Sequence, residues 1–149
     1  YFVRGCTALY DAIGYTISKL EKEVKNKVLF IITTDGLENA SAKYNKKKVS
    51  SLIRKHSDWE FIYLGANIDS YEEGNSIGIR KDRISNYEQS SKGIARMFSK
   101  LSDISNCLYA NEEIESNWNA DLENEKDICD DFNAGIAGKY DCLRRRQGR

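Results

Sequence analysis

The feature that most restricts the fold is a short apolar run, Val28 to Thr34, which stops at a turn signal, Asp35-Gly36. The run places β-branched and aromatic residues in consecutive rather than alternating positions, so apolar side chains would point to both faces of a strand. Parallel strands that are covered on both faces have this pattern. The run therefore predicts a central parallel strand of an α/β fold.

Helical and strand-like segments alternate on either side of this run. Apolar side chains at helical spacing predict helices over residues 7–25, 45–56 and 91–108, with Thr7 and Asn45 as candidate caps of the first two. Capping-box spacing from Ser70 to Glu73 predicts a short helix that Gly78 can end. Two further strands are predicted at 59–64 and 83–87. Short connections between such segments favour a parallel sheet with helices on both faces. We therefore predict a three-layer α-β-α, Rossmann-like domain over residues 1–110.

The composition changes after this domain. Acidic residues dominate 111–131, and arginines gather near the C-terminal end. Opposite charge blocks either fold back on each other or form a solvated arm. We expect residues 111–149 to form a charged C-terminal extension that is partly helical, around 126–137, or flexible.

Composition also narrows the class of protein. The 23 basic and 23 acidic residues balance, which argues against nucleic-acid binding. The longest apolar run is too short to span a bilayer, and no leader indicates secretion, so a cytoplasmic location is predicted. Four cysteines without C-x-x-C spacing and a single histidine, His56, argue against a zinc site. Thiols in a reducing compartment are the better interpretation, although the even count also allows two disulfides.

Candidate ligand-binding residues lie where the predicted strands end. Asp35 follows the first strand, Asn67 follows the second, and the loop at Thr7 leads into the first helix. Ligands of open parallel sheets bind at the carboxyl ends of the strands, and a carboxylate with a hydroxyl suits a hard cation such as Mg²⁺. Spacing alone slightly favours a simpler interpretation, in which Asp35 caps the turn before Gly36.

Four blocks of this sequence resemble a von Willebrand factor type A domain of the small bacterial and phage cytoplasmic branch. The blocks run from Gly5 to Ile13, from Phe30 to Ser41 and from Trp59 to Asn67, and end with Gly78-Ile79. They occur in the family's order, and the resemblance extends from Tyr1 to about Leu108, nearly three-quarters of the chain.

The resemblance implies a metal-ion-dependent adhesion site. Thr7 matches the threonine ligand of the family's second loop, and Asp35 matches the aspartate of its third loop. The rim that would face a partner comprises Gly5, Cys6, Gly36, Glu38, Asn39 and Asn67. The first loop of the family, Asp-x-Ser-x-Ser, is missing, so the chain resembles an N-terminally truncated domain. Two protein ligands would bind Mg²⁺, or Mn²⁺, only weakly.

The missing first strand has a second consequence. In the family, the strand that matches Val28 to Thr34 pairs with it, so that strand's edge would be bare here, which natural proteins avoid. We expect the C-terminal extension, a second copy of the chain or a separate partner to fill the edge, and we favour self-association into a homo-oligomer.

Three classes of function follow. The first is a non-enzymatic binding module, in which Mg²⁺ joins the site to an acidic side chain of a protein partner. The second is a metal-free scaffold that self-associates. The third, an enzyme that uses Asp35 for phosphotransfer or hydrolysis, is least favoured, because the phosphate-loop, dinucleotide and nucleophile motifs are missing from the sequence.

Overall fold

The computed structural model describes residues 6–66 and 68–123. Helices and strands alternate along these residues. In chain order they are α1 (Leu9–Glu23), β1 (Leu29–Thr34), α2 (Lys46–Lys55), β2 (Glu60–Gly65), α3 (Ser70–Ser76), the 3-10 turn η1 (Lys81–Arg83), β3 (Ile84–Asn86), α4 (Ser91–Tyr109) and α5 (Ala120–Glu123). The predicted mixed α/β class is confirmed, and the predicted helix at 126–137 lies outside the described residues.

The three strands form one parallel sheet in the order β1-β2-β3. Leu29 to Thr34 pair with Glu60 to Gly65, and Tyr63 to Gly65 pair with Ile84 to Asn86. The prediction that residues 28–34 form the central strand is wrong for the described residues. β2 is central and almost wholly buried, whereas β1 lies at an edge with Ile31 and Thr33 exposed, because the apolar run has a neighbour on one side only.

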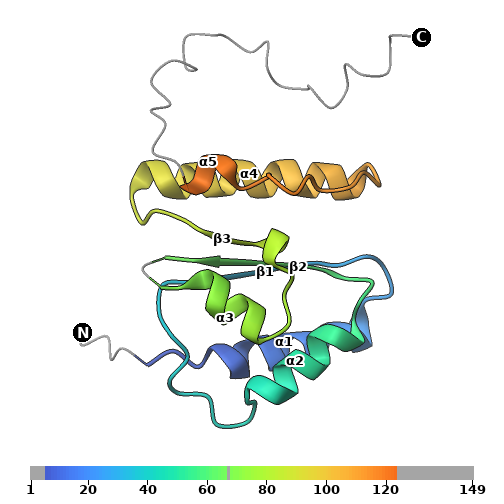
Figure 1. Cartoon of the computed structure of the whole chain (residues 1–149). Coiled ribbons are helices and arrows are strands. Elements are labelled where there is room, and N and C mark those ends of the chain that lie inside the picture. The colour runs from blue at the N-terminus through green and yellow to red at the C-terminus, as the bar shows by residue number, and fades with distance from the viewer. Residues whose placement is uncertain (1–5, 67, 124–149) are drawn as a thin grey trace, which may run out of the picture.

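One face of the sheet is covered by α1, α2 and α3 (Figure 1). Alternate residues of β1, Phe30 and Ile32, point into this layer, together with Phe61 and Tyr63 of β2. They pack against apolar side chains of the helices and the segments between them, namely Ile13, Ile17, Val49, Ile53, Ile77 and Ile79. This is the larger of the two cores, and it holds the N-terminal helix against the sheet.

The opposite face is covered by α4 and by the segment that contains α5 (Figure 1). Ile62 and Leu64 of β2 pack there against Met97 and Ile104 of α4. Ile114, Trp118 and Leu122 complete this second core. The molecule thus has three layers, and residues 111–123 of the predicted extension are packed on the sheet.

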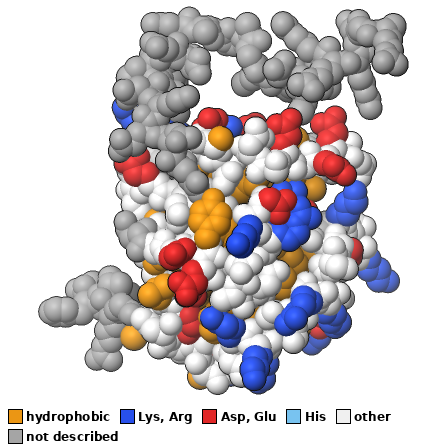
Figure 2. Space-filling view, viewed as in Figure 1, with side chains coloured by type: hydrophobic (Ala, Val, Ile, Leu, Met, Phe, Trp, Pro, Cys, Tyr) orange, Lys and Arg blue, Asp and Glu red, His pale blue; other side chains and the backbone are white. Residues whose placement is uncertain are grey.

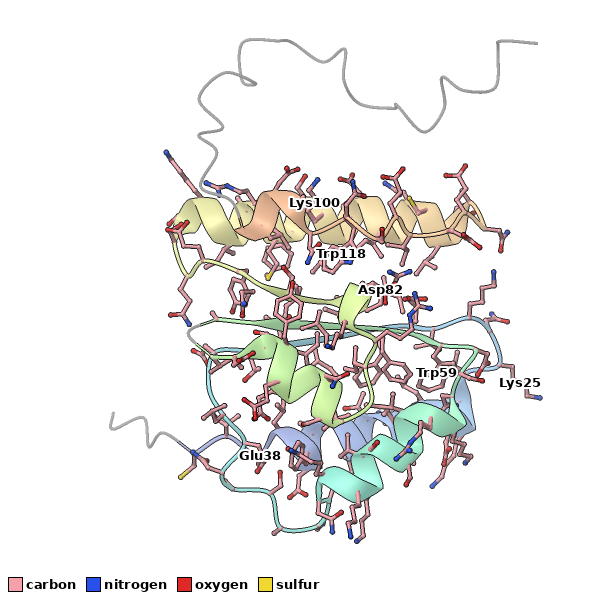
Figure 3. The ribbon with its side chains drawn as sticks, viewed as in Figure 1. Lys25, Glu38, Trp59, Asp82, Lys100 and Trp118 are labelled. Carbon is pink, nitrogen blue, oxygen red and sulfur yellow. The ribbon has the colours of Figure 1, made fainter. Side chains whose placement is uncertain are left out.

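Hydrogen bonds between distant residues fix that segment. The indole of Trp118 donates to the carbonyl of Asp82 at 2.8 Å, and Figure 3 shows Trp118 between the helical layer and the sheet. Arg83, which is buried, forms ion pairs with Glu60 and Asp82 and donates to the carbonyl of Ile114 at 3.2 Å. Within the described ranges, no helix is long and apolar enough to cross a membrane.

Most helix boundaries follow local signals. Asn45 caps α2 as predicted, accepting the N–H of Lys48 at 3.0 Å. The cap of α3 is Asp69, which accepts the N–H of Glu72 at 2.9 Å, rather than Ser70 as the capping-box pattern predicts. Gly78, with a φ of +95°, ends α3 as predicted, because glycine adopts this left-handed conformation without strain.

Candidate functional site

The N-terminus of α1 and the C-terminal end of β1 meet at one edge of the sheet. The Thr7 hydroxyl lies 3.2 Å from the position that a Cβ atom at Gly36 would occupy. Asn39 holds this arrangement from both directions: its side chain accepts the N–H of Thr7 at 2.8 Å, and its own N–H donates to the carbonyl of Thr7 at 3.1 Å. The fold therefore brings Thr7 beside the Asp35-Gly36 turn. We call Thr7, Asp35 and Gly36 the crest.

The turn after β1 is closed by Thr34 rather than by the Asp35 carboxylate. The hydroxyl of Thr34 donates to the carbonyl of Gly36 at 2.8 Å and accepts the N–H of Gly36 at 3.3 Å. Asp35 is exposed, and its Oδ2 accepts the side-chain amide of Gln89 at 3.3 Å. In the structure, Thr34 takes the capping role that the simpler interpretation gives to Asp35.

Two residues near Asp35 were not singled out by the sequence, Tyr87 and Gln89. Burial, together with the negative charge of Asp35, raises the pKa of the Tyr87 hydroxyl. Both residues belong to the connection from β3 to α4, which passes near the end of β1 even though β3 lies at the far edge of the sheet. The end of a strand at Tyr87 is visible in the sequence, but the path of this connection depends on where α4 packs.

Glu38, predicted on the partner-facing rim, caps α1 from the neighbouring loop. Its Oε2 accepts the N–H of Tyr10 and the hydroxyl of Ser41, each at 2.7 Å, and its Oε1 accepts the N–H groups of Ala40 and Ser41 at 2.9 and 2.7 Å. The N-cap residue of α1, Ala8, makes no side-chain cap bond. Glu38 therefore supplies the hydrogen-bond acceptor for the first turn of α1 that the side chain of a local N-cap residue would otherwise provide.

Asp11, in the first turn of α1, holds the other end of this loop. Its carboxylate accepts the N–H groups of Ala42, Lys43 and Tyr44 at 2.9, 2.9 and 2.7 Å. Hydrogen bonds from the backbone, those of Ala42 and Tyr44 foremost, lower the pKa of Asp11. For Glu38, burial raises the pKa, but the bonds from Tyr10 and Ser41 outweigh it and the pKa is lowered. Both carboxylates thus favour their charged forms.

The remaining predicted rim residues are only partly described. Cys6 is exposed with a free thiol, Gly36 is partly buried and Asn39 is exposed. Gly5 and Asn67 lie outside the described residues, as do two of the four cysteines. The described part of the rim therefore offers small or polar groups beside the crest.

The donor atoms at the crest are of the types that a hard divalent cation prefers, but they are few. Thr7 supplies a hydroxyl oxygen and Asp35 a carboxylate, both of which suit Mg²⁺. No group of three or more histidine, cysteine, aspartate or glutamate side chains able to hold a metal occurs among residues 6–66 and 68–123. Gly36 leaves open the space next to the Thr7 hydroxyl that a larger residue would fill. Water or a partner would have to supply the rest of an octahedral shell.

Comparison with models of known families, with curated proteins and with solved structures gave no match. Over residues 6–66 and 68–123 the fold defines the class: an α/β protein with a three-stranded parallel sheet between layers of helices. The face of the molecule in Figure 2 carries acidic and basic side chains side by side.

Proposed function

We propose that this chain is a non-enzymatic protein-binding module of the von Willebrand factor type A kind, in which Thr7 and Asp35 hold Mg²⁺ for an acidic side chain of a protein partner. Mn²⁺, which also accepts oxygen ligands, would replace it. The proposal includes the family assignment and a cytoplasmic location, and it rests on the sequence blocks together with the crest.

The observation that carries the proposal is the freedom of the Asp35 carboxylate from a structural role in its own turn. Thr34 makes both hydrogen bonds to Gly36, while Asp35 stays exposed at the end of β1. The carboxylate oxygens of Asp11 and Glu38, by contrast, accept hydrogen bonds from backbone N–H groups. Asp35 is exposed and accepts from the amide of Gln89, so of these three carboxylates it is the one that we expect to exchange its partner for an external ligand.

The chemistry of the crest explains why a cation would be required. Asp35 would repel a partner's carboxylate, so direct contact between them is unfavourable. A bound divalent ion supplies positive charge and open coordination positions for that carboxylate. Thr7 and Asp35 would orient the ion, and Asn39 would keep Thr7 in place through the two bonds described above.

A metal-free scaffold is the second candidate. It is favoured by the small number of ligands at the crest and by the exposed edge of β1. A scaffold would respond equally to Mg²⁺ and to a monovalent salt at the same ionic strength, whereas a metal module would not.

Thermal unfolding in rising Mg²⁺, against NaCl at matched ionic strength, separates these candidates. A ligand at ten times its Kd stabilises a protein by about 1.4 kcal/mol, which corresponds to roughly 4 °C for a domain of this size. We expect Asp35→Ala to abolish this shift. Asp58→Ala, an exposed aspartate beside the opposite end of the sheet, should retain it.

Thr7→Val and Gly36→Ala test the geometry of the site. The first removes the hydroxyl and keeps the shape, and the second places a methyl group 3.2 Å from that hydroxyl. Both should weaken the response to Mg²⁺. No Mg²⁺-specific shift in the unaltered protein, or the same shift in Asp35→Ala, would refute the metal module and leave the scaffold.

A further inference from the structure

The backbone groups along the outer edge of β1 pair with no strand in the described part of the chain, and they follow a defined order. At the two ends of the β1–β2 ladder, the carbonyl of Val28 accepts the N–H of Glu60 at 2.8 Å and that of Thr34 accepts the N–H of Ala66 at 3.0 Å. In a parallel ladder, alternate residues of a strand bond to the same neighbour. The even-numbered residues of β1 therefore face β2, and Leu29, Ile31 and Thr33 turn their N–H and C=O groups outward.

No strand within residues 6–66 and 68–123 pairs with that edge. Each outward residue presents one donor and one acceptor, so the edge offers three of each. An extended edge of this kind is a template for another strand. The sheet can therefore grow on this side.

The side chains along the same edge are apolar and exposed. Ile31, on the α4 side of the sheet, is 37% exposed, and Ile94 and Phe98 of α4 are 39% and 62% exposed. Lys100 of α4 forms an ion pair with Asp121 of α5, and α5 also contacts β3. Phe98 and Lys100 lie on opposite flanks of α4, because two positions along a helix differ by about 200°. Ile94 and Phe98 therefore lie on the flank directed toward the β1 edge.

We propose that this edge binds a second copy of the chain, with the two β1 strands antiparallel about a two-fold axis through Ile31. In this register Ile31 faces Ile31 of the other copy, and Leu29 faces Thr33. Directly opposed residues of this kind exchange both backbone hydrogen bonds. All three outward residues of each strand are then paired.

Charge at the two ends of the strand selects the same register. Lys27 precedes β1 and Asp35 follows it, and both lie four positions from Ile31. Within one chain the Lys27 ammonium donates to Asn111 at 2.7 Å and Asp35 accepts from Gln89 at 3.3 Å, so both charged groups have neutral partners that a group of opposite charge would replace. The two-fold arrangement thus brings Lys27 of each copy opposite Asp35 of the other. A slip by two residues would leave one outward residue of each strand unpaired and separate these opposite charges.

The two-fold axis also explains the exposed apolar side chains. It runs perpendicular to the sheet, so the α4 helices of both copies lie on the same face of a continuous six-stranded sheet. The Ile31 side chains of the two copies meet at the centre of that face. The flanks of the two α4 helices that carry Ile94 and Phe98 approach them from both sides. Dimerisation would remove this surface from water, which is the driving force for association.

Sedimentation velocity of the full chain in EDTA tests the proposal without the metal site. We expect a species with the mass of two chains at micromolar concentrations. Ile31→Lys places two like charges at the axis and should give a monomer with unchanged circular dichroism. Tyr15→Lys, which alters an exposed aromatic residue of α1, should remain dimeric.

Two further pairs of variants test the register. Lys27→Glu alone should weaken the dimer, and adding Asp35→Lys should restore it by exchanging the two charges. Under mild oxidation, Ile31→Cys should form a bond between positions 31 of the two copies, identified by peptide mass spectrometry, because opposed residues lie at disulfide distance. Thr33→Cys should not join to itself, because residue 33 faces residue 29.

A monomer at all concentrations would overturn the proposal and assign the edge to another segment of the chain or to a different partner. A dimer that persists in Ile31→Lys, or equal cross-linking of Ile31→Cys and Thr33→Cys, would also overturn it.

Discussion

Glu38 joins parts of the chain that are far apart in sequence. It lies beside α1 (Figure 3). One of its hydrogen bonds, from the N–H of Tyr10, reaches that helix, and the other three fix the loop after β1 that contains it. Because the same loop positions Asn39, and Asn39 holds Thr7, the geometry of the crest depends on this carboxylate. Asp11 secures the loop farther along, at residues 42–44.

Replacing Glu38 with Gln should destabilise the protein. The amide keeps the size of the side chain but cannot accept at both oxygen positions, so the N–H groups of Ala40 and Ser41 or of Tyr10 lose a partner. Loss of a helix cap costs about 1 kcal/mol, or roughly 3 °C in Tm. Glu113→Gln, at an exposed position, is the control. An equal Tm for both variants in calorimetry would contradict this role.

The same residue should affect the dependence of stability on pH. The pKa of Glu38 is lowered in the folded protein, so the unfolded chain binds its proton more tightly. Its contribution is therefore complete above the ordinary pKa of a glutamate, about 4.3, and is lost as the pH falls from there through the lower pKa of the folded state. Thermal unfolding between about pH 6 and 3 should show a smaller loss in Glu38→Gln than in the unaltered protein.

These residue contacts explain which members of the candidate site can be predicted from the sequence and which cannot. Thr7 and Asp35 can be found because each adjoins a recognisable helix or strand. The cap of α1 cannot be found in this way. The local pattern favours Thr7, whereas the observed cap, Glu38, lies about thirty positions farther along the chain. The same applies to Gln89, whose contact with Asp35 spans 54 positions.

At the scale of elements, the periodic segments were predictable and their neighbours were not. The pattern for 91–108 predicts α4 to within one residue at its C-terminal end, and the pattern for 45–56 predicts α2. The order of the strands is harder to predict from the sequence. The most apolar run forms β1 at the edge of the sheet, while the segment that begins near Trp59 provides the buried central strand β2. Local composition records how apolar a strand is, but its neighbours depend on contacts with other parts of the chain.

The segment after α4 supplies a prediction at this scale. Trp118 is buried against β2 and α4. Trp118→Ala should lower the free energy of unfolding by about 3 kcal/mol because it leaves a cavity. Trp118→Phe keeps most of the apolar contact and removes the bond to the carbonyl of Asp82, so about 1 kcal/mol is expected beyond any packing change. Urea unfolding measures both. Unchanged stability in Trp118→Ala would mean that this segment does not belong to the core.

At the scale of the whole molecule, the proposed dimer and the proposed metal site both use the carboxylate of Asp35. In the dimer this carboxylate faces Lys27 of the other copy, and in the metal site it faces Mg²⁺. Two ligands that need the same group oppose each other by linkage, so each weakens the other's binding. Millimolar Mg²⁺ should therefore shift sedimentation toward the monomer more than NaCl does at the same ionic strength. A dimer strengthened by Mg²⁺ would contradict this competition.

The central claim is that the crest holds a divalent ion, and paramagnetic Mn²⁺ tests it most directly. In nitrogen–proton correlation spectra, substoichiometric Mn²⁺ should broaden the amide signals of Thr7, Asp35 and Gly36 first, and excess Mg²⁺ should restore them. Broadening that begins instead around the acidic residues Glu112 and Glu113, or that persists unchanged in Asp35→Ala, would show that the ion binds elsewhere.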